Sequence, residues 1–139
     1  MLERTLAIVK PDAVAKGLMG EVIKRYEASA FKIVALKMVA LTKSQAEEFY
    51  AVHRGKGFYE SLTTYMSSGP IAAMVLEGKD AIRRHRQVIG ATDPALAEPG
   101  TIRRDFGTTI ERNVIHGSDG PETASFEISF FFNSLDFIS

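Results

Sequence analysis

From Thr5 to Gly90, short apolar runs alternate with segments in which apolar residues recur at helical spacing. Three segments, Thr5–Val9, Phe31–Leu41 and Ile71–Leu76, are apolar and rich in residues that favour strands, which predicts three buried β-strands. Between them, apolar residues return every three or four positions, which predicts amphipathic helices. The predicted helices are Val22–Ala30, Thr42–Gly55, Phe58–Met66 and Ala81–Gly90.

The same pattern predicts which faces of these elements are buried. In the second strand, alternation places Val34, Leu36 and Met38 on one face. Thr42 and Gln45 have the spacing of a capping box, so the next helix should begin there. The residues expected on its inward stripe are Ala46, Phe49, Tyr50 and His53.

The C-terminal part of the chain has a different pattern. From Ala91 to Asn113 the periodicity disappears, and a loop this long in a compact domain is usually functional or an interface. Asn113–His116 is short and apolar, which predicts a fourth strand, and the last helix is predicted over Pro121–Leu135. The order of elements predicts an α+β fold: a ferredoxin-like βαββαβ sandwich, in which helices cover a four-stranded antiparallel sheet, with a long loop before the last strand.

Composition narrows the class of protein. The chain has 139 residues, so we expect residues 1–139 to form a single domain. Seventeen basic residues balance seventeen acidic ones, which argues against a strong nucleic-acid or membrane surface. The absence of cysteine excludes disulfides and thiolate catalysis. No secretory signal or membrane span is visible, so the expected localisation is cytoplasmic.

One of the three histidines is a candidate for chemistry. His85 falls on the apolar face of its helix and His53 near a helix end, so structural roles are expected for both. His116 ends an apolar strand just before a helix start, where Asp119 is the expected cap and Pro121 suits the first turn. At such a junction, backbone N–H groups point at a bound anion.

Glu127 falls on the edge of the buried stripe of the last helix. A carboxylate turned inward is unfavourable unless it is paired. Two kinds of partner are open: an imidazole such as that of His116, whose orientation and tautomer the carboxylate would set, or an arginine or water. The stripe itself is expected to comprise Ala124, Ile128, Phe131, Phe132 and Leu135.

Basic residues are the candidate phosphate ligands. They are Lys10, Arg83, Arg84, Arg86, Arg103 and Arg104. Taken singly, each is more often a solvated surface charge. No Walker loop, dinucleotide fingerprint or zinc spacing is present. The pattern alone therefore indicates a small α+β protein with one candidate catalytic histidine, and it does not identify the reaction.

A resemblance does identify a reaction. The segment Asn113-Val-Ile-His116-Gly-Ser118-Asp119 resembles the signature of nucleoside diphosphate kinases, in which the histidine is the phosphorylated nucleophile. The match covers nearly the whole chain, and the co-occurrence of its motifs in family order and spacing is very specific. The other motifs are Lys10-Pro11-Asp12, Phe49-Tyr50, Gly69-Pro70, Gly90-Ala-Thr92-Asp-Pro94 and Pro99-Gly-Thr-Ile-Arg103.

The resemblance implies a ping-pong phosphotransferase. It would transfer the γ-phosphate of a nucleoside triphosphate to a nucleoside diphosphate through a phosphohistidine on His116, with broad base specificity. A neutral imidazole suits this chemistry because it is nucleophilic near neutral pH. Mg²⁺ would be held mainly by the nucleotide phosphates and water, with no direct protein ligand.

The resemblance also implies catalytic roles for individual residues. Lys10 would contact the transferring phosphate and the sugar hydroxyl, and Tyr50 would lie beside the path of the phosphate. Ser118 and Glu127 would orient His116.

Nucleotide-binding roles follow from the resemblance in the same way. Phe58 would stack on the base, a contact that every base permits. Arg86, Thr92 and Arg103 would hold the phosphates, and Asn113 would hold the sugar.

Four positions depart from the pattern of the family. Ala30 stands where relatives often carry glycine, and it would cost roughly 1 kcal/mol if its φ is positive. Val52 occupies a position that is often acidic. Gly120 stands where many relatives have serine or threonine, and Pro121 replaces a common aliphatic residue. Because proline suits the first turn of a helix, we expect a stiffer helix start and little loss of activity.

The expected partners are nucleoside di- and triphosphates and further copies of the chain. The family forms homotetramers or homohexamers, and both assemblies stay open here. Phe126 and Phe130 fall opposite the buried stripe, so they should pack against the tail Leu135–Ile138 or another subunit.

Two other functions are open: a binding protein on this fold that has lost catalysis, and a histidine phosphocarrier, which would need no base-stacking Phe58.

Overall fold

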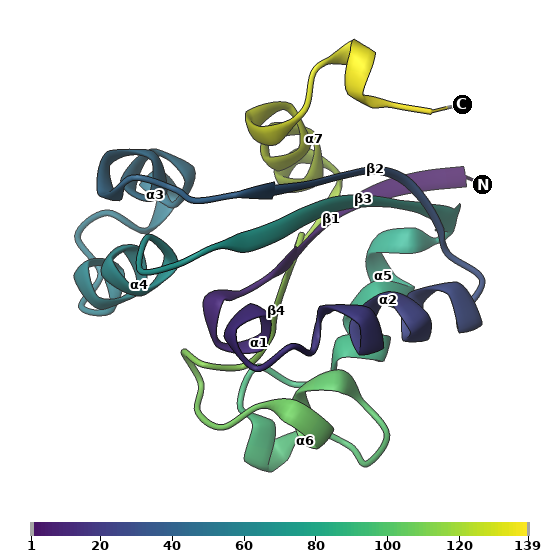
Figure 1. Cartoon of the computed structure of the whole chain (residues 1–139), viewed down its shortest axis with the longest axis horizontal. Helices are drawn as coiled ribbons and strands as arrows, with labels where there is room; N and C mark the ends of the chain where they lie inside the picture. Colours follow the sequence, from purple (N-terminus) through teal and green to yellow (C-terminus); the bar gives the residue numbers. More distant parts are fainter. Residues whose placement is uncertain (1, 139) are drawn as a thin grey trace.

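Four strands form one antiparallel sheet in the order β2-β3-β1-β4 (Figure 1). The computed structural model describes residues 2–138. The central strand β1 (Leu2–Val9) pairs along its whole length with β3 (Ile71–Lys79) and, on its other side, with the short β4 (Ile115–Gly117). The strand β2 (Lys32–Val39) lies at the edge beside β3. This is the ferredoxin-like topology that the sequence predicts.

Helices lie on both sides of the sheet (Figure 1). The helices α2 (Met19–Ala28) and α5 (Ala81–Ile89) cover one face, and α7 (Pro121–Phe131) covers the other. The remaining elements are α1 (Pro11–Ala15), α3 (Lys43–Phe49), α4 (Tyr59–Met66), α6 (Ile102–Phe106) and the 3₁₀ turns η1 (Ala51–His53), η2 (Pro94–Leu96) and η3 (Ser134–Asp136). Within residues 2–138, no helix is long and apolar enough to cross a bilayer.

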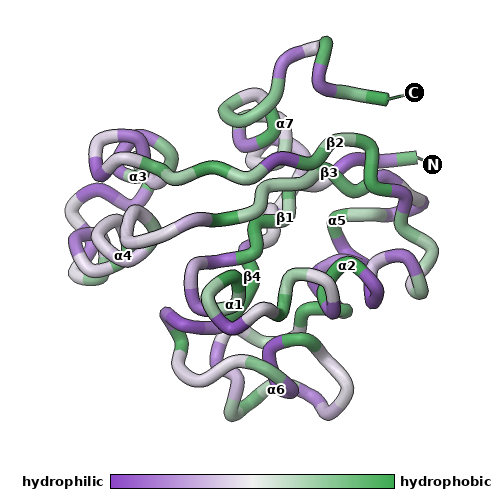
Figure 2. The backbone as a smooth tube through the Cα atoms, viewed as in Figure 1, coloured by the Kyte–Doolittle hydropathy of each residue, from purple (hydrophilic) through white to green (hydrophobic). Residues whose placement is uncertain are grey.

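Strand alternation builds a separate core on each face of the sheet. Leu6 and Ile8 pack with residues of α3, α4 and α7, whereas Ala7 and Val9 pack with residues of α1, α2, α5 and α6. All four are fully buried, and each leucine or isoleucine side chain contributes roughly 1.5–3 kcal/mol in this way. Because both faces are covered there, Leu6–Val9 of β1 and Ile71–Leu76 of β3 are continuous apolar runs rather than alternating ones (Figure 2).

The predicted face of the second strand was wrong. Val34 is buried, but Leu36 and Met38 are 49% and 52% exposed. The pairing of β2 with β3 shifts register between Ile33 and Ala35, so a β-bulge inserts Val34 as an extra residue. A shift of one residue turns all following side chains to the other face. Leu36 and Met38 therefore project from an exposed edge strand.

The capping box is present, but the helix that it starts is shorter than predicted. The Thr42 hydroxyl accepts the N–H of Gln45 (3.1 Å), and the Gln45 side chain accepts the N–H of Thr42 (2.9 Å). The helix α3 ends at Phe49, and η1 follows it, so His53 lies outside the predicted inward stripe. The turn at Lys10 leads into α1, a helix of five residues that is too short to show a period.

The sequence predicts a long loop over Ala91–Asn113, but this segment contains regular structure. It contains η2 and α6. The Asp93 carboxylate caps η2 by accepting the N–H of Ala95 (3.0 Å), and the Thr101 hydroxyl caps α6. Elements of three to five residues show no helical period, so the cap residues were the available signal.

The last helix also ends earlier than predicted. It stops at Phe131, and Leu135 is 93% exposed rather than part of the buried stripe. Phe126 and Phe130 pack against the ring of Phe49 at centroid separations of 6.5 and 5.2 Å, a contact that was not predicted. Their packing against the tail or another subunit stays a prediction.

Ala30, which follows α2, has a φ of 63°. This left-handed conformation costs an alanine roughly 1 kcal/mol relative to glycine, so Ala30→Gly should raise the free energy of unfolding by about that amount. The control is Ala28→Gly in the exposed last turn of α2, which should lower it by roughly 0.5–1 kcal/mol. Chemical denaturation measures both, and a loss of stability in both variants would contradict strain at Ala30.

Candidate active site

His116 projects from β4 toward the face that α7 covers. In the pairing of β1 with β4 it lies opposite Ile8, which belongs to the core beneath α3, α4 and α7. Its ring packs edge-on against Phe49 and Tyr50, at centroid separations of 5.5 and 6.0 Å. The hydroxyl of Tyr50 is buried and has no hydrogen-bond partner within residues 2–138. The imidazole therefore packs against two aromatic side chains.

The partner of the buried Glu127 carboxylate is the imidazole of His116. Oε1 of Glu127 lies 2.9 Å from Nε2 of His116 and accepts a 2.8 Å hydrogen bond from the Ser118 hydroxyl. The Ser118 oxygen in turn accepts the N–H of Leu6 (3.3 Å), which ties the pair to β1. An acceptor at Nε2 places the proton of the neutral ring there, so Nδ1 keeps a free lone pair.

Lys10 is a buried cation at the end of β1. Its ammonium donates to Oδ1 of Asn113 (2.8 Å) and to the carbonyl of Glu111 (3.3 Å), and Asn113 donates to the carbonyl of Thr92 (2.9 Å). Burial, and then the charge of Arg103, lowers the pKa of Lys10 to about 8. A nearby anion would favour the charged form of this lysine.

Arg103, in α6, is a second buried cation. It donates to the carbonyls of Gly90 (3.1 Å) and Ile115 (2.8 Å), and within residues 2–138 its Nε has no hydrogen-bond partner. Burial, and then the charge of Arg86, lowers the pKa of Arg103 to about 10. No carboxylate bonds to this guanidinium among the described residues, so a bound phosphate would supply its missing counter-charge.

A strained turn leads from Asn113 into β4. Val114 has a φ of 78°, and the N–H of Ile115 donates to the carbonyl of Asn113 (2.9 Å), which defines a γ-turn. Such a conformation costs a β-branched residue of order 1–3 kcal/mol and persists only where the surroundings impose it. The carbonyl of Val114 accepts the N–H of Lys10 (2.8 Å), and the N–H of Val114 donates to Oδ2 of Asp12 (3.2 Å).

Most of the predicted site residues line one cleft of about 410 Å³. They are Lys10, Tyr50, Phe58, Arg86, Thr92, Arg103, Asn113 and His116, with Ser118 and Glu127 behind His116. Phe58, Leu62 and Ile110 add apolar surface to the same cleft. The cleft therefore suits a ligand that combines a flat apolar part with several negative charges.

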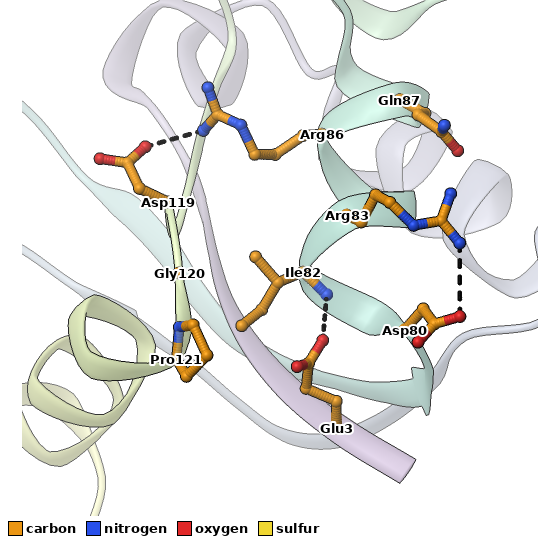
Figure 3. A pocket seen from close by; sticks show the side chains of 9 residues that line it. All are labelled: Glu3, Asp80, Ile82, Arg83, Arg86, Gln87, Asp119, Gly120 and Pro121. Atoms are coloured by element: carbon orange, nitrogen blue, oxygen red, sulfur yellow. Dashed lines mark hydrogen bonds and ion pairs between the residues drawn. The ribbon is translucent and has the colours of Figure 1, made fainter. Parts of the chain in front are cut away.

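Arg86 and Asp119 form an ion pair at the edge of this cleft. Nη1 of Arg86 lies 2.8 Å from Oδ1 of Asp119 (Figure 3). The prediction that Asp119 caps the last helix was wrong, because Gly120 is the N-cap of α7 and no side-chain bond caps it. Pro121 occupies the first turn as predicted. The Asp119 carboxylate is free to face the cleft because the extended backbone of Gly120 separates it from the helix.

The same ion pair also lines a second groove of about 570 Å³ (Figure 3). Its charged side chains are already paired or hydrogen-bonded. Arg83 pairs with Asp80 (3.3 Å), and the Glu3 carboxylate accepts the N–H of Ile82 (2.9 Å). We therefore place the candidate site in the smaller cleft, where no carboxylate of the described residues bonds to the buried cations Lys10 and Arg103.

The other two histidines differ in position. His85 is buried, with Nε2 2.8 Å from the Tyr26 hydroxyl, and burial lowers its pKa to about 3, so the ring stays neutral as a structural residue. It packs on Gly117, where a Cβ would lie 2.7 Å from Nδ1 of His85.

His53, interpreted from the sequence as structural, lines the cleft with its ring centroid 5.2 Å from that of Phe58. No local signal could show this, because the position depends on η1.

A carboxylate-oriented imidazole that faces a cationic, partly apolar cleft can accept a phosphate from a nucleotide. The fold and the site therefore define a nucleotide phosphotransferase. The sequence model of the family described as nucleoside diphosphate kinase matches residues 3–137, so the chain belongs to the nucleoside diphosphate kinase family. It transfers the γ-phosphate of a nucleoside triphosphate to a nucleoside diphosphate.

Individual relatives agree with this assignment. The nucleoside diphosphate kinase of Desulfosudis oleivorans is 62% identical over 135 residues, which covers 97% of each chain. The solved nucleoside diphosphate kinase of Aquifex aeolicus is 49% identical, with a TM-score of 0.98 over 99% of this chain and 100% of that one. The enzyme of Halobacterium salinarum, solved with CDP, is 42% identical, with a TM-score of 0.96 over 100% of this chain and 93% of that one.

The lowered pKa of Lys10 predicts a pH dependence. We expect kcat/KM for a nucleoside triphosphate to fall as the pH rises through about 8, because Lys10 of the free enzyme loses its charge there. A solvent-exposed lysine would keep its charge to about pH 10.

Steady-state rates between about pH 6 and pH 10 test this expectation. Lys10→Arg is the control, because a guanidinium stays protonated over this range and should remove the decline. A wild-type profile that stays level to about pH 10 would contradict the lowered pKa.

Proposed function

We propose that His116 is the residue that accepts and returns the phosphate. The observation that carries the proposal is the 2.9 Å contact between Nε2 of His116 and Glu127, which leaves Nδ1 as the nucleophilic nitrogen. In the first half-reaction a bond forms between Nδ1 and the γ-phosphorus, the bond to the β–γ bridging oxygen breaks, and the diphosphate leaves with that electron pair. A second nucleoside diphosphate then attacks the phosphohistidine in the reverse sense.

The roles of the nearby residues follow from charge and position. Glu127, supported by Ser118, would stabilise the positive charge that the ring gains as Nδ1 bonds to phosphorus. Lys10 would neutralise charge on the transferring phosphate, and the unpartnered hydroxyl of Tyr50 would donate to an oxygen of that phosphate.

The rest of the cleft would bind the nucleotide. Arg103 and Arg86 would hold the phosphates with Thr92, and Asn113 would bind the sugar. Phe58 is 48% exposed, so one face of its ring is available to stack on a base. Stacking distinguishes little among bases, which supports a broad nucleotide specificity.

We also propose that Mg²⁺ enters with the nucleotide. Within residues 2–138, no group of three or more metal-ligating side chains is placed to hold a metal ion. Mg²⁺ usually keeps several waters and binds through phosphates and one or two carboxylates, so phosphate oxygens would be its main ligands. Asp119 is the carboxylate of the cleft that could bind one of those waters. When bound, the ion supplies neutralisation of the phosphate charge.

The two alternative functions account for fewer observations. A phosphocarrier between proteins would need an exposed histidine, but no apolar wall of Phe58, Leu62 and Ile110 and no buried Arg103. A binding protein that had lost catalysis would not need a carboxylate positioned on Nε2 of His116.

The assembly and location of the chain are further proposals. We propose that residues 1–139 form one domain of a cytoplasmic homo-oligomer, a tetramer or hexamer, without a nucleic-acid partner. The balance of seventeen basic and seventeen acidic residues supports the last point. Leu36 and Met38 support an assembly through β2, because exposed apolar side chains on an edge strand favour pairing with another chain.

The proposed role of His116 can be tested by intact mass measurement. Wild-type protein incubated with ATP and Mg²⁺ should gain the mass of one phosphate and lose it on addition of GDP, with GTP appearing. His116→Ala should gain none. Glu127→Gln should be phosphorylated about 10–100-fold more slowly, because the ring loses its charged partner. An equal mass gain in His116→Ala would move the phosphate to another residue.

The proposed assembly predicts an effect of charge on β2. Lysine at both Leu36 and Met38 should reduce the number of subunits, because edge lysines oppose pairing between strands. Light scattering measures the mass of the assembly. The control is Val52→Lys, at another exposed apolar residue (80% exposed), which should leave the mass unchanged. An unchanged mass in the β2 variant would exclude this strand from the interface.

A further inference from the structure

Asp12 contacts the strained turn at Val114 from outside the cleft. Its Oδ2 accepts the N–H of Val114 at 3.2 Å, across 102 positions of sequence. Asp12 lies in the first turn of α1 and is not among the residues that line the cleft. It therefore holds the turn from behind the cleft. Its negative charge also partly offsets the lowering of the Lys10 pKa.

Tyr65, in α4, fixes the position of the Asp12 carboxylate. The Tyr65 hydroxyl donates to Oδ1 of Asp12 at 2.6 Å and accepts the backbone N–H of Asp12 at 2.7 Å. The tyrosine is 7% exposed, and the Arg112 guanidinium lies over its ring, 5.1 Å from the centroid. Burial, and then the hydrogen bond to Asp12, raises the pKa of Tyr65, so the hydroxyl remains a donor at neutral pH.

The turn joins the residues whose separation the reaction depends on. Its first residue is Asn113, which binds the Lys10 ammonium, and its carbonyl at Val114 binds the Lys10 N–H. Its last residue, Ile115, begins β4, and His116 follows at once. A valine at positive φ would relax if its N–H lost its acceptor. Relaxation would move Asn113 and Lys10 relative to His116.

We propose that Asp12, held by Tyr65, is a positioning residue that keeps Val114 in the γ-turn and so sets the distance between His116 and the nucleotide-binding pair Lys10 and Asn113. The inference rests on the proposed role of His116. The hydrogen bond from His116 to Glu127 links β4 to α7 and does not involve the turn. The reactivity of the imidazole itself should therefore be independent of Asp12.

The test compares two phosphate donors in wild type, Asp12→Ala, Asp12→Asn, Val114→Gly and the double variant Asp12→Ala/Val114→Gly. ATP requires the whole cleft, whereas phosphoramidate, a small donor without a nucleoside, requires only a reactive His116. The measured quantity is the rate at which the phosphohistidine forms. A melting temperature for each variant shows that it is folded.

Asp12→Ala should lose about 100-fold in the rate with ATP, because a small misplacement of reacting groups has an effect of this size. Its rate with phosphoramidate should stay near that of wild type. Asp12→Asn keeps an oxygen that can accept the Val114 N–H and should retain most of the ATP rate. Glycine adopts positive φ without strain, so adding Val114→Gly to Asp12→Ala should restore about tenfold or more.

A second pair of variants decides the matter if Asp12→Ala or Val114→Gly does not fold. Tyr65→Phe removes the hydroxyl that holds Asp12, and it should slow phosphorylation by ATP but not by phosphoramidate. The matched control is Tyr59→Phe on the same helix, which removes a hydroxyl that donates to the Glu47 carbonyl (3.0 Å) rather than to Asp12. This control should change neither rate.

Three results would overturn the positioning role. They are an unchanged ATP rate in Asp12→Ala, an equal loss with both donors, and no rescue by Val114→Gly in a folded double variant. In the second pair, equal behaviour of Tyr65→Phe and Tyr59→Phe would also overturn it. A wild-type protein that forms no phosphohistidine with either donor would instead refute the role of His116.

Discussion

The hydrogen bond between Nε2 of His116 and the Glu127 carboxylate is the interaction on which the site depends. A buried carboxylate is unfavourable without partners, and here the imidazole and the Ser118 hydroxyl both bind the same oxygen. Because Ser118 also accepts the N–H of Leu6, this pair connects α7 to β1 and β4. The same bond determines the tautomer of the ring, so it sets the position of the imidazole and leaves Nδ1 with a free lone pair.

The cleft is where the chain departs from the rules that its core obeys. Lys10 and Arg103 are buried without a carboxylate bonded to them among the described residues, and Val114 adopts a strained backbone. Each feature is unfavourable in the free protein. Each also prepares the cleft for a polyanionic ligand, because the cations are already placed and the chain leading to His116 is already turned. Departures of this kind are expected at functional sites.

Much of the candidate site could be predicted, because its residues lie in motifs with a fixed order and spacing. Those motifs led to His116, Lys10 and Arg103, which the structure brings to one cleft. The place of His53 at the cleft was missed, because it depends on a 3₁₀ turn. Asp12 stands in the motif Lys10-Pro11-Asp12, but its contact with Val114 was not predicted, because the two residues are 102 positions apart in sequence.

The sequence by itself determined the order and type of the longer elements, because the spacing of apolar residues records which faces are buried. It also determined the capping box at Thr42, which is a local property. Only the tertiary structure decided that a bulge turns Leu36 outward, that Glu127 binds an imidazole and that Asp119 binds Arg86. These outcomes depend on side chains that are distant in sequence, and a local pattern carries no information about which of them meet.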